Sequence, residues 1–389
     1  MNRRTVLTSV VATSFATGAA LSACSVGVSD GDRVRGATTE RPPVLRQPGV
    51  STLPPAAAVQ AAFDVRGADR LALAGVLRRL TAVISALAGR YAGLGRPVEV
   101  MVAVGASLFD GRFGLGSHRP RALVVMPSFP NDVLDPARCH GDLLVQVCAG
   151  DVETVRSVLA ELAVPGLVPR WRVEGFRDQN SVTGDGRAVD RNLFGFRDGA
   201  GNPDVRDAAE MERLVWVGAD AGEPAWAVGG SYQVVRIIRF ATALWDGESV
   251  ARQEAVFGRR KSDGAPLGLD REDAVFDYGS DPSGQVIALD AHIRRANPRT
   301  PETAGSRILR RGYSYRGGVD AAGRRDEGML FICFQRDVEA GFATMQRRLA
   351  GEALDRYVLP VGGGYFFVLP GVSGGDGDYL GRTLIDAAG

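Results

Sequence analysis

The sequence predicts an α+β fold in which two halves share one design. Strand-like and helix-like segments alternate along a chain of 389 residues, which is too long for one ordinary core and favours two domains. Residues 141–153 and 328–339 form a faint internal repeat, in which an apolar strand runs into an acidic helix start. Tandem ferredoxin-like halves place strands and helices in this mixed order, and we expect the boundary after Phe240.

Hydrophobic periodicity predicts the individual elements, with ordered structure from about Ala56. Leucines and valines recur at helical spacing between Ala68 and Arg90, which predicts a long helix. A second helix is expected from Val152 to Leu162. Short apolar or alternating runs predict the strands, at residues 98–104, 122–126, 143–147, 232–240 and 365–369.

The N-terminal residues have the features of an export signal and not of a folded core. Arg3 and Arg4 form the pair of a twin-arginine signal, and the mild apolar stretch behind them is too short for a stable membrane span. The run that ends at Cys24 resembles a bacterial lipobox, which would give a lipid anchor; ordinary signal cleavage near Ala23 is the alternative. The sequence therefore predicts a protein of the periplasm or cell envelope, in contact with a membrane only through this anchor.

Composition divides the rest of the chain. Residues 25–52 are rich in Gly, Ser, Pro, Arg and Asp without an apolar period, which predicts a flexible linker. The expected organisation is a signal with a lipobox at 1–24, the linker at 25–52, an N-terminal ferredoxin-like domain at 53–240 and a C-terminal one at 241–389.

The charge balance and the few cysteines exclude several classes of function. A net charge of +1 provides no basic field for nucleic acid. The single lysine, Lys261, lies in the polar run 259–264, which predicts a solvated loop. Cys139, Cys148 and Cys333 form no even-numbered disulfide framework. Cys148 and Cys333 are expected as buried thiols, and a Cys139–Cys148 disulfide stays open as an alternative.

Residues 195–199, Gly-Phe-Arg-Asp-Gly, form the most informative stretch, because an acid is held between glycines beside an arginine. Glycines allow sharp turns and close approach of the backbone to a flat ligand, although such a turn alone is commonly structural. Downstream, His292 lies in an arginine-rich run, and Arg310 and Arg311 form a pair. An acid, a histidine and an arginine in this order are the parts that a haem peroxidase needs, and the chain has only 3 histidines.

Four stretches together resemble the dye-decolourising (DyP-type) haem peroxidase family, and within it the exported EfeB-type deferrochelatases of bacterial iron-uptake operons. They are residues 194–199, 291–303, 308–311 and 360–371, in this order and behind a twin-arginine signal. The likeness extends from about Gln47 to Leu380. The Gly-x-x-Asp-Gly turn alone is a weak signal, whereas the four stretches in order form a specific match.

This resemblance implies two ferredoxin-like domains, each with a four-stranded antiparallel sheet as in dimeric α/β-barrel proteins, and one haem b held mostly by the second. Asp198 would be the distal acid, His292 the iron ligand and Arg310 the distal arginine, a role for which Arg311 competes. The residues expected to border the haem are Gly199, Ala200, Gly201, Asn297, Pro298 and Arg299. The implied partners are hydrogen peroxide, a reducing substrate, proteins of an iron-uptake operon and a second copy of the chain.

The predicted residues suit peroxidase chemistry. Neutral imidazole is the usual axial ligand of a peroxidase haem, and its other ring nitrogen normally donates to an acid or a carbonyl. Asp290, Asp337 and Glu339 are the candidates for that acid. Asp198 could move a proton between the two oxygens of peroxide, and Arg310 could stabilise the developing negative charge. A salt bridge or a clamp on a haem propionate is the alternative role of Arg310.

Other candidate residues are expected to be structural. His118 and His140 lie in polar loops rich in Gly and Pro and are expected at the surface. Several aromatic residues could pass electrons from large reductants, although most are expected to pack in the core: Trp171, Trp216, Trp226, Trp245, Tyr313 and Tyr315.

Three functions stay open at this point. The first is an exported peroxidase that oxidises dyes, phenols or a native reductant. The second is the release of iron from haem with the porphyrin left intact. The third is a lipid-anchored haem or iron carrier without turnover, against which the predicted pair of an acid and an arginine argues.

Overall fold

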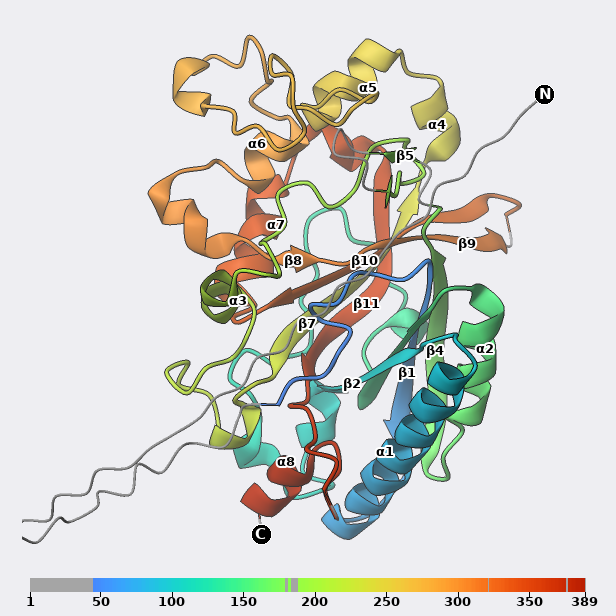
Figure 1. The fold of residues 1–389 in the computed structure, drawn as a ribbon. Coiled ribbons are helices and arrows are strands. Elements are labelled where there is room, and N and C mark those ends of the chain that lie inside the picture. Colours follow the sequence, from blue (N-terminus) through green and yellow to red (C-terminus); the bar gives the residue numbers. More distant parts are fainter. Residues whose placement is uncertain (1–44, 179–180, 183–187, 321, 376, 389) are drawn as a thin grey trace, which may run out of the picture. The chain divides into compact units, whose positions relative to one another are not determined.

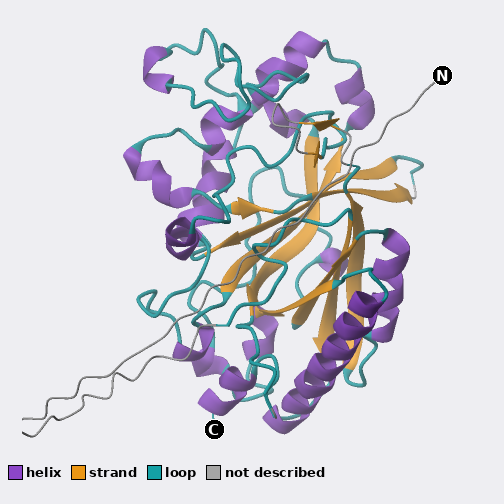
Figure 2. Ribbon diagram, viewed as in Figure 1, coloured by secondary structure: helices purple, strands orange, loops and turns teal. Residues whose placement is uncertain are grey.

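The structure is a computed structural model that describes residues 45–178, 181–182, 188–320, 322–375 and 377–388. The predicted signal, the candidate anchor Cys24 and most of the predicted linker lie outside these residues. The described residues form one compact unit of sheets and covering helices (Figures 1 and 2).

Two four-stranded antiparallel sheets make up the centre of the fold. The N-terminal sheet has the order β2-β3-β1-β4, and the C-terminal sheet has the order β11-β7-β10-β9. The N-terminal strands are β1 (Ala57–Val65), β2 (Glu99–Gly105), β3 (Leu143–Ala149) and β4 (Leu167–Phe176). The C-terminal strands are β7 (Ser231–Phe240), β9 (Tyr313–Val319), β10 (Arg325–Gln335) and β11 (Val358–Val368). This confirms the predicted tandem ferredoxin-like architecture.

The two sheets are joined edge to edge. Strand β11 pairs with β2, and β4 pairs with β9 through Phe176 and Ser314, so the eight strands close on themselves as a barrel. The short strand β8 (Leu309–Arg310) pairs with β10 at Cys333 and Phe334. The interior is filled from both sheets by buried side chains that include Ala62, Met101, Leu144, Val235, Ile332 and Phe366. Closure leaves the outer face of each sheet to be covered by helices.

Two helices cover the outer face of the N-terminal sheet. Helix α1 (Arg70–Gly93) begins where the Asp69 side chain accepts the Ala72 N–H, and α2 (Val152–Glu161) begins at Asp151 in the same way. Among the described residues, α1 is the one helix long and apolar enough to cross a membrane by length and composition. Leu73, Leu77 and Leu80, which recur at helical spacing, are buried in the core beneath it, whereas Leu71 in the first turn is exposed.

The outer face of the C-terminal sheet is covered by short helices and loops. A π-helical turn, Glu339–Ala343, leads into α7 (Thr344–Leu349), and α7 lies against α6 (His292–Ala296).

The remaining short elements are distributed over the described residues. The other helices are α3 (Ala208–Leu214), α4 (Thr242–Asp246), α5 (Val250–Phe257) and α8 (Arg382–Ala387). A small hairpin pairs β5 (Ser181–Val182) with β6 (Ala188–Val189). Single 3₁₀ turns lie at Ala106–Phe109, Gly116–His118, Pro136–Arg138, Ala225–Ala227, Tyr278–Ser280, Pro301–Ser306 and Ala353–Arg356.

Most of the predicted elements are confirmed, namely both helices and the strands at 98–104, 143–147 and 232–240. The strand predicted at 365–369 is confirmed as the end of β11, which finishes at Val368. The strand predicted at residues 122–126 is wrong. This segment is unpaired, with Leu123 and Met126 buried and Val125 exposed. Prolines precede and follow it, and the Ala122 N–H donates to the Tyr232 hydroxyl in place of a neighbouring strand.

The internal repeat corresponds to equivalent structures. Strand β3 leads to Asp151 and α2, while β10 leads to Asp337, whose carboxylate accepts the N–H groups of Glu339 and Ala340. The predicted domain boundary after residue 240 divides the chain directly behind β7. The partners of β7 are β10 and β11, so this strand belongs by its pairing to the C-terminal sheet.

Two smaller predictions concern cysteine and lysine. Cys139, Cys148 and Cys333 are free and buried, so the Cys139–Cys148 disulfide is absent from the described residues. The solvated loop predicted at 259–264 is wrong, because this run packs on the 195–199 turn. The Lys261 ammonium donates to Gln253 Oε1 over 2.7 Å, and its side chain lies against Gly195.

Candidate active site

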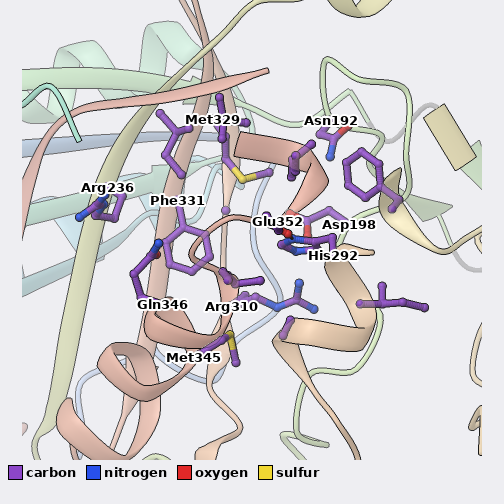
Figure 3. A pocket seen from close by; sticks show the side chains of 18 of the residues that line it. Asn192, Asp198, Arg236, His292, Arg310, Met329, Phe331, Met345, Gln346 and Glu352 are labelled. Carbon is purple, nitrogen blue, oxygen red and sulfur yellow. The ribbon is translucent and has the colours of Figure 1, made fainter. Parts of the chain in front are cut away.

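A large cavity lies against the outer face of the C-terminal sheet. Its empty space is about 1700 Å³, counting the open mouth. Figure 3 shows labelled side chains from four parts of the fold turned toward it: Arg236 of β7, Met329 and Phe331 of β10, His292 of α6, and Met345 of α7. Apolar side chains form the wall on the side of the sheet, while arginines, a histidine and acids come from the surrounding loops.

The Gly-Phe-Arg-Asp-Gly turn forms one side of the cavity. Gly195 and Gly199 have φ angles of 83° and 97°, which favour glycine. A Cβ atom at Gly195 would lie 2.5 Å from Lys261 Cε, so a side chain at this position would displace Lys261. Arg197 anchors the turn through a 3.0 Å ion pair with Glu272 and a hydrogen bond to the Asp263 carbonyl. The turn therefore presents Asp198 to the cavity on a fixed backbone.

Asp198 lies beside the segment that carries the distal arginine. One carboxylate oxygen accepts the Gly199 N–H over 2.8 Å. The other would lie 3.3 Å from a Cβ atom at Gly312, which places the carboxylate against the backbone two residues beyond Arg310. The structure thus brings Asp198 and Arg310 to one region of the cavity, as the sequence predicted.

The two adjacent arginines have different roles in the fold. Arg310 lines the cavity, where its guanidinium donates to the Ala200 carbonyl and to Asn202 Oδ1. Arg311 points away, is 3% exposed and forms a 2.8 Å ion pair with Glu99 of β2. Arg311 therefore joins the two sheets, and Arg310 is the member of the pair that can meet a ligand.

His292 is the first residue of α6 and is tied to an acid that the sequence did not indicate. Its Nδ1 lies 2.7 Å from Glu352 Oε2, and the Glu352 side chain is 5% exposed. With the proton on Nδ1, the ring donates to this carboxylate and leaves the Nε2 lone pair for a metal. The predicted candidates Asp290, Asp337 and Glu339 are therefore wrong for this role.

Backbone contacts explain how Glu352 reaches a histidine that lies 60 residues earlier. The Ala353 N–H donates to the Asp290 carbonyl over 3.1 Å, and Arg295 donates to the Ala350 carbonyl over 2.7 Å. These two bonds join the turn after α7 to the segment that contains His292. Sequence spacing alone gives no signal for this pairing, because it depends on the packing of α6 and α7.

Three arginines at the cavity, Arg259, Arg299 and Arg310, form no ion pair with a carboxylate among the described residues. Burial, together with the positive charges of Arg310 and Arg299, lowers the pKa of Arg259 to about 10. The Arg299 Nε is buried and has no hydrogen-bond partner among the described residues. Such a cluster of cations fits a ligand that carries carboxylates or other anionic groups.

The remaining predicted residues divide into two groups. Gly199, Ala200, Gly201, Asn297 and Arg299 line the cavity with Asp198, His292 and Arg310, whereas Pro298 is not among its lining residues. His118 and His140 are both half-buried, not fully at the surface, and lie outside the cavity. The four tryptophans, Tyr313 and Tyr315 are buried packing residues, as expected.

Asp190 is a buried acid behind the cavity that the sequence did not indicate. It is 3% exposed, its carboxylate accepts the Asp178 N–H, and its carbonyl accepts the Asp198 N–H over 3.1 Å. Burial, which outweighs the opposing charge of Arg177 and is assisted by the charge of Asp198, raises the pKa of Asp190 to about 6.

Two family models match most of the chain. The N-terminal model of the Dyp-type peroxidases matches residues 47–177, and the C-terminal model matches residues 189–373. The chain belongs to the Dyp-type peroxidase family. The C-terminal match contains all of the predicted site residues, and the gap between the two matches lies before the boundary predicted at residue 240.

Curated proteins and solved structures agree with this family. The chain is 46% identical over 362 residues to proteins named deferrochelatase from Shigella flexneri and Escherichia coli, covering 87% of this chain and 86% or 85% of the relative. Ferric DtpA from Streptomyces lividans superposes with a TM-score of 0.78 at 36% identity, over 88% of this chain and 95% of that one. A DyP-type peroxidase from Cellulomonas bogoriensis gives 0.79 at 34% identity, over 88% and 96%.

The cavity residues of this Dyp-type peroxidase fit a haem. His292 offers an imidazole nitrogen whose orientation Glu352 fixes, and apolar side chains such as Met329 and Phe331 offer a wall for a flat macrocycle. The unpartnered Arg299 Nε and the charge around Arg259 suit the carboxylates of the haem propionates. The imidazole, the apolar wall and the arginines of the cavity therefore agree with haem, the cofactor that the family implies.

Proposed function

We propose that this chain is an exported haem peroxidase that uses hydrogen peroxide to oxidise a small or dye-like reductant. The observation that carries the proposal is that one cavity combines a carboxylate-bound histidine with an acid and with an arginine that forms no ion pair among the described residues. Haem, when bound, supplies the iron that activates peroxide and stores the oxidising equivalents. A carrier would need the histidine but neither Asp198 nor Arg310.

The chain's own residues then have distinct tasks. His292 would hold the iron through Nε2, and Glu352 keeps the ring in one tautomer and orientation. Asp198 would accept a proton from one oxygen of peroxide and deliver it to the other, so that the O–O bond breaks and water leaves, with the two electrons supplied by the haem. Arg310 holds a positive charge where negative charge develops on the peroxide.

Variants of the distal pair test the peroxidase against a carrier. Asp198→Asn keeps the size of the side chain but removes a base, which is typically worth about 10²–10⁴-fold in rate. Arg310→Leu removes one charged donor, worth about 10²–10³-fold. Both variants should bind haem, and at least one should react with peroxide far more slowly in stopped-flow absorbance measurements. Wild-type rates in both variants would leave the carrier as the better account.

Release of iron from haem is the second candidate function, because the relatives at 46% identity are named deferrochelatase. The same cavity could hold haem as a substrate. Product analysis separates the two activities: free porphyrin should accumulate if iron is released, whereas peroxide-dependent oxidation of an added reductant should leave the haem intact.

Export and anchoring form a separate part of the proposal. Residues 1–44, with Arg3, Arg4 and Cys24, lie outside the described residues, so their sequence alone supports it. Changing both arginines to lysine should block export by the twin-arginine route. Mass spectrometry of the mature N-terminus should find a lipidated Cys24, and an unmodified or different first residue would exclude the anchor.

A further inference from the structure

Asn202 is bound to Arg310 more completely than any other side chain near the cavity. Its amide oxygen accepts from the Arg310 backbone N–H and from Arg310 Nε, both over 3.2 Å, and its amide nitrogen donates to the Arg310 carbonyl over 2.8 Å. Arg310 Nη2 also donates to the Ala200 carbonyl. The turn that presents Asp198 therefore also holds the arginine, although 108 residues separate Asn202 from Arg310.

The hydrogen-bond partners of Arg310 among the described residues, Asn202 and the Ala200 carbonyl, are electrically neutral. In the part of the chain that the structure describes, no ion pair joins Arg310 to a carboxylate. Its neighbours differ, since Arg307 pairs with Glu210 and Arg311 pairs with Glu99. An amide oxygen can orient a guanidinium without cancelling its charge, whereas a carboxylate at the same distance would also neutralise it.

We propose that Asn202 is a positioning residue that holds Arg310 at the cavity while leaving the arginine's positive charge available to a ligand. This inference rests on the proposed function, in which Arg310 meets peroxide. It assigns to Asn202 a role that depends on two properties of its side chain: the donor and acceptor that fix Arg310, and the absence of charge.

Two variants separate these properties. Asn202→Asp keeps the shape but adds a carboxylate 3.2 Å from Arg310 Nε, so at neutral pH the rate of reaction with peroxide should fall about 10²-fold. Asn202→Ala should slow the reaction only about tenfold, because it removes the contacts that fix Arg310 without adding a charge. Gln285→Glu, which adds the same charge at an exposed position, is the control.

Fluoride binding gives a readout that does not depend on turnover. Fluoride titrations of the haem-loaded proteins, followed in the visible spectrum, should show about tenfold weaker binding for Asn202→Asp at neutral pH and wild-type binding for Gln285→Glu. Equal fluoride affinity in all three proteins would contradict the claim that the charge of Arg310 faces the ligand and is preserved by Asn202.

A double-mutant cycle tests whether Asn202 acts through Arg310. In the Arg310→Leu background, Asn202→Ala should change the peroxide rate less than twofold, because the residue that it positions is gone. Additive effects would overturn the inference. The outcomes also separate the two proposals: if Arg310→Leu is slow while both Asn202 variants react like the wild type, the inference fails and the peroxidase stands. If the wild type itself does not react with peroxide, the proposed function fails.

Discussion

The two sheets carry the same strand-to-helix motif, but in the described residues the haem-sized cavity lies against the C-terminal sheet, whereas helices pack directly on the N-terminal sheet. In the N-terminal half, β3 leads through Asp151 into α2, whose Val155 and Val158 are fully buried on the sheet. In the C-terminal half, β10 leads through Asp337 into a π-helical turn and α7, which lies against α6. One design thus produces a filled core in one half and a binding site in the other.

The difference depends on what covers the outer face. Helices α1 and α2 place rows of apolar side chains directly on the N-terminal sheet. Over the C-terminal sheet, the segment between β7 and β8 contributes His292 and Arg299 to the cavity lining, and the turn after α7 contributes Glu352. Strand β8, which pairs with β10, contributes Arg310. The comparison indicates that the outer face of the N-terminal sheet contributes mainly to stability. The outer face of the C-terminal sheet is packed less completely and leaves space for a ligand.

Truncation of one apolar residue in each half should mainly lower stability in the N-terminal half and mainly weaken haem binding in the C-terminal half. Leu77→Ala in α1 should lower the free energy of unfolding by about 2–5 kcal/mol, because Leu77 is fully buried, and should leave haem affinity unchanged. Phe331→Ala at the cavity wall should cost less stability in the protein without haem, because Phe331 is only partly buried, but should weaken haem binding. Denaturant unfolding and haem titration measure the two effects. Equal losses of stability in the two variants would contradict the claim that the N-terminal face contributes mainly stability and the C-terminal face mainly the binding site.

The buried acid Asp190 should make the stability of the fold depend on pH. Folding raises the pKa of Asp190 to about 6 from its ordinary 3.8, so the protonated form stabilises the fold and this stabilisation is lost as the pH rises from about 4 through 6. Asp190→Asn should therefore be more stable than the wild type at pH 8, by at most about 3 kcal/mol, and equally stable near pH 4. Unfolding titrations at both pH values measure this difference.

Asp142 of the N-terminal half is the matched control for Asp190. Its carboxylate is fully partnered by Arg112 over 2.8 Å, the Ser107 hydroxyl over 2.6 Å and the Val65 N–H over 2.8 Å. Asp142→Asn should therefore lose stability at pH 8, because it breaks a satisfied buried network. A gain of stability in Asp142→Asn, or a loss in Asp190→Asn at pH 8, would contradict the comparison.

The smallest expected effect concerns the acid that orients His292. Glu352→Gln keeps a hydrogen-bond acceptor for the ring but removes the negative charge, and loss of such a partner typically costs about 10–100-fold in metal affinity or activity. Haem should still bind, with a raised reduction potential because the imidazole becomes less basic. Spectroelectrochemical titration checks this, with Glu339→Gln, at an exposed acid on the π-helical turn, as the control. An unchanged potential would show that Glu352 has only a structural role.

The sequence predicted the residues that face the ligand, but not the residues that hold them in place. Asp198, His292 and Arg310 lie in local motifs, and the periodicity of α1 and the repeated strand-to-helix motif are local as well. Glu352, Asn202 and Asp190 act through contacts between segments far apart in the chain or through burial, which local patterns do not encode. The strand predicted at 122–126 is wrong partly for the same reason. Its apolar run favours a strand, but the Ala122 N–H donates to Tyr232, a distant residue, and the flanking prolines disfavour pairing with a neighbouring strand.

The central claim is that the cavity of the C-terminal half binds haem through His292. The most direct measurement is a haem titration of the purified protein followed by its visible spectrum, for the wild type, His292→Ala and the control His118→Ala. The account predicts one haem per chain with a histidine-ligated spectrum in the wild type and the control, and loss of haem or of that spectrum in His292→Ala. Full haem binding with an unchanged spectrum in His292→Ala would contradict it.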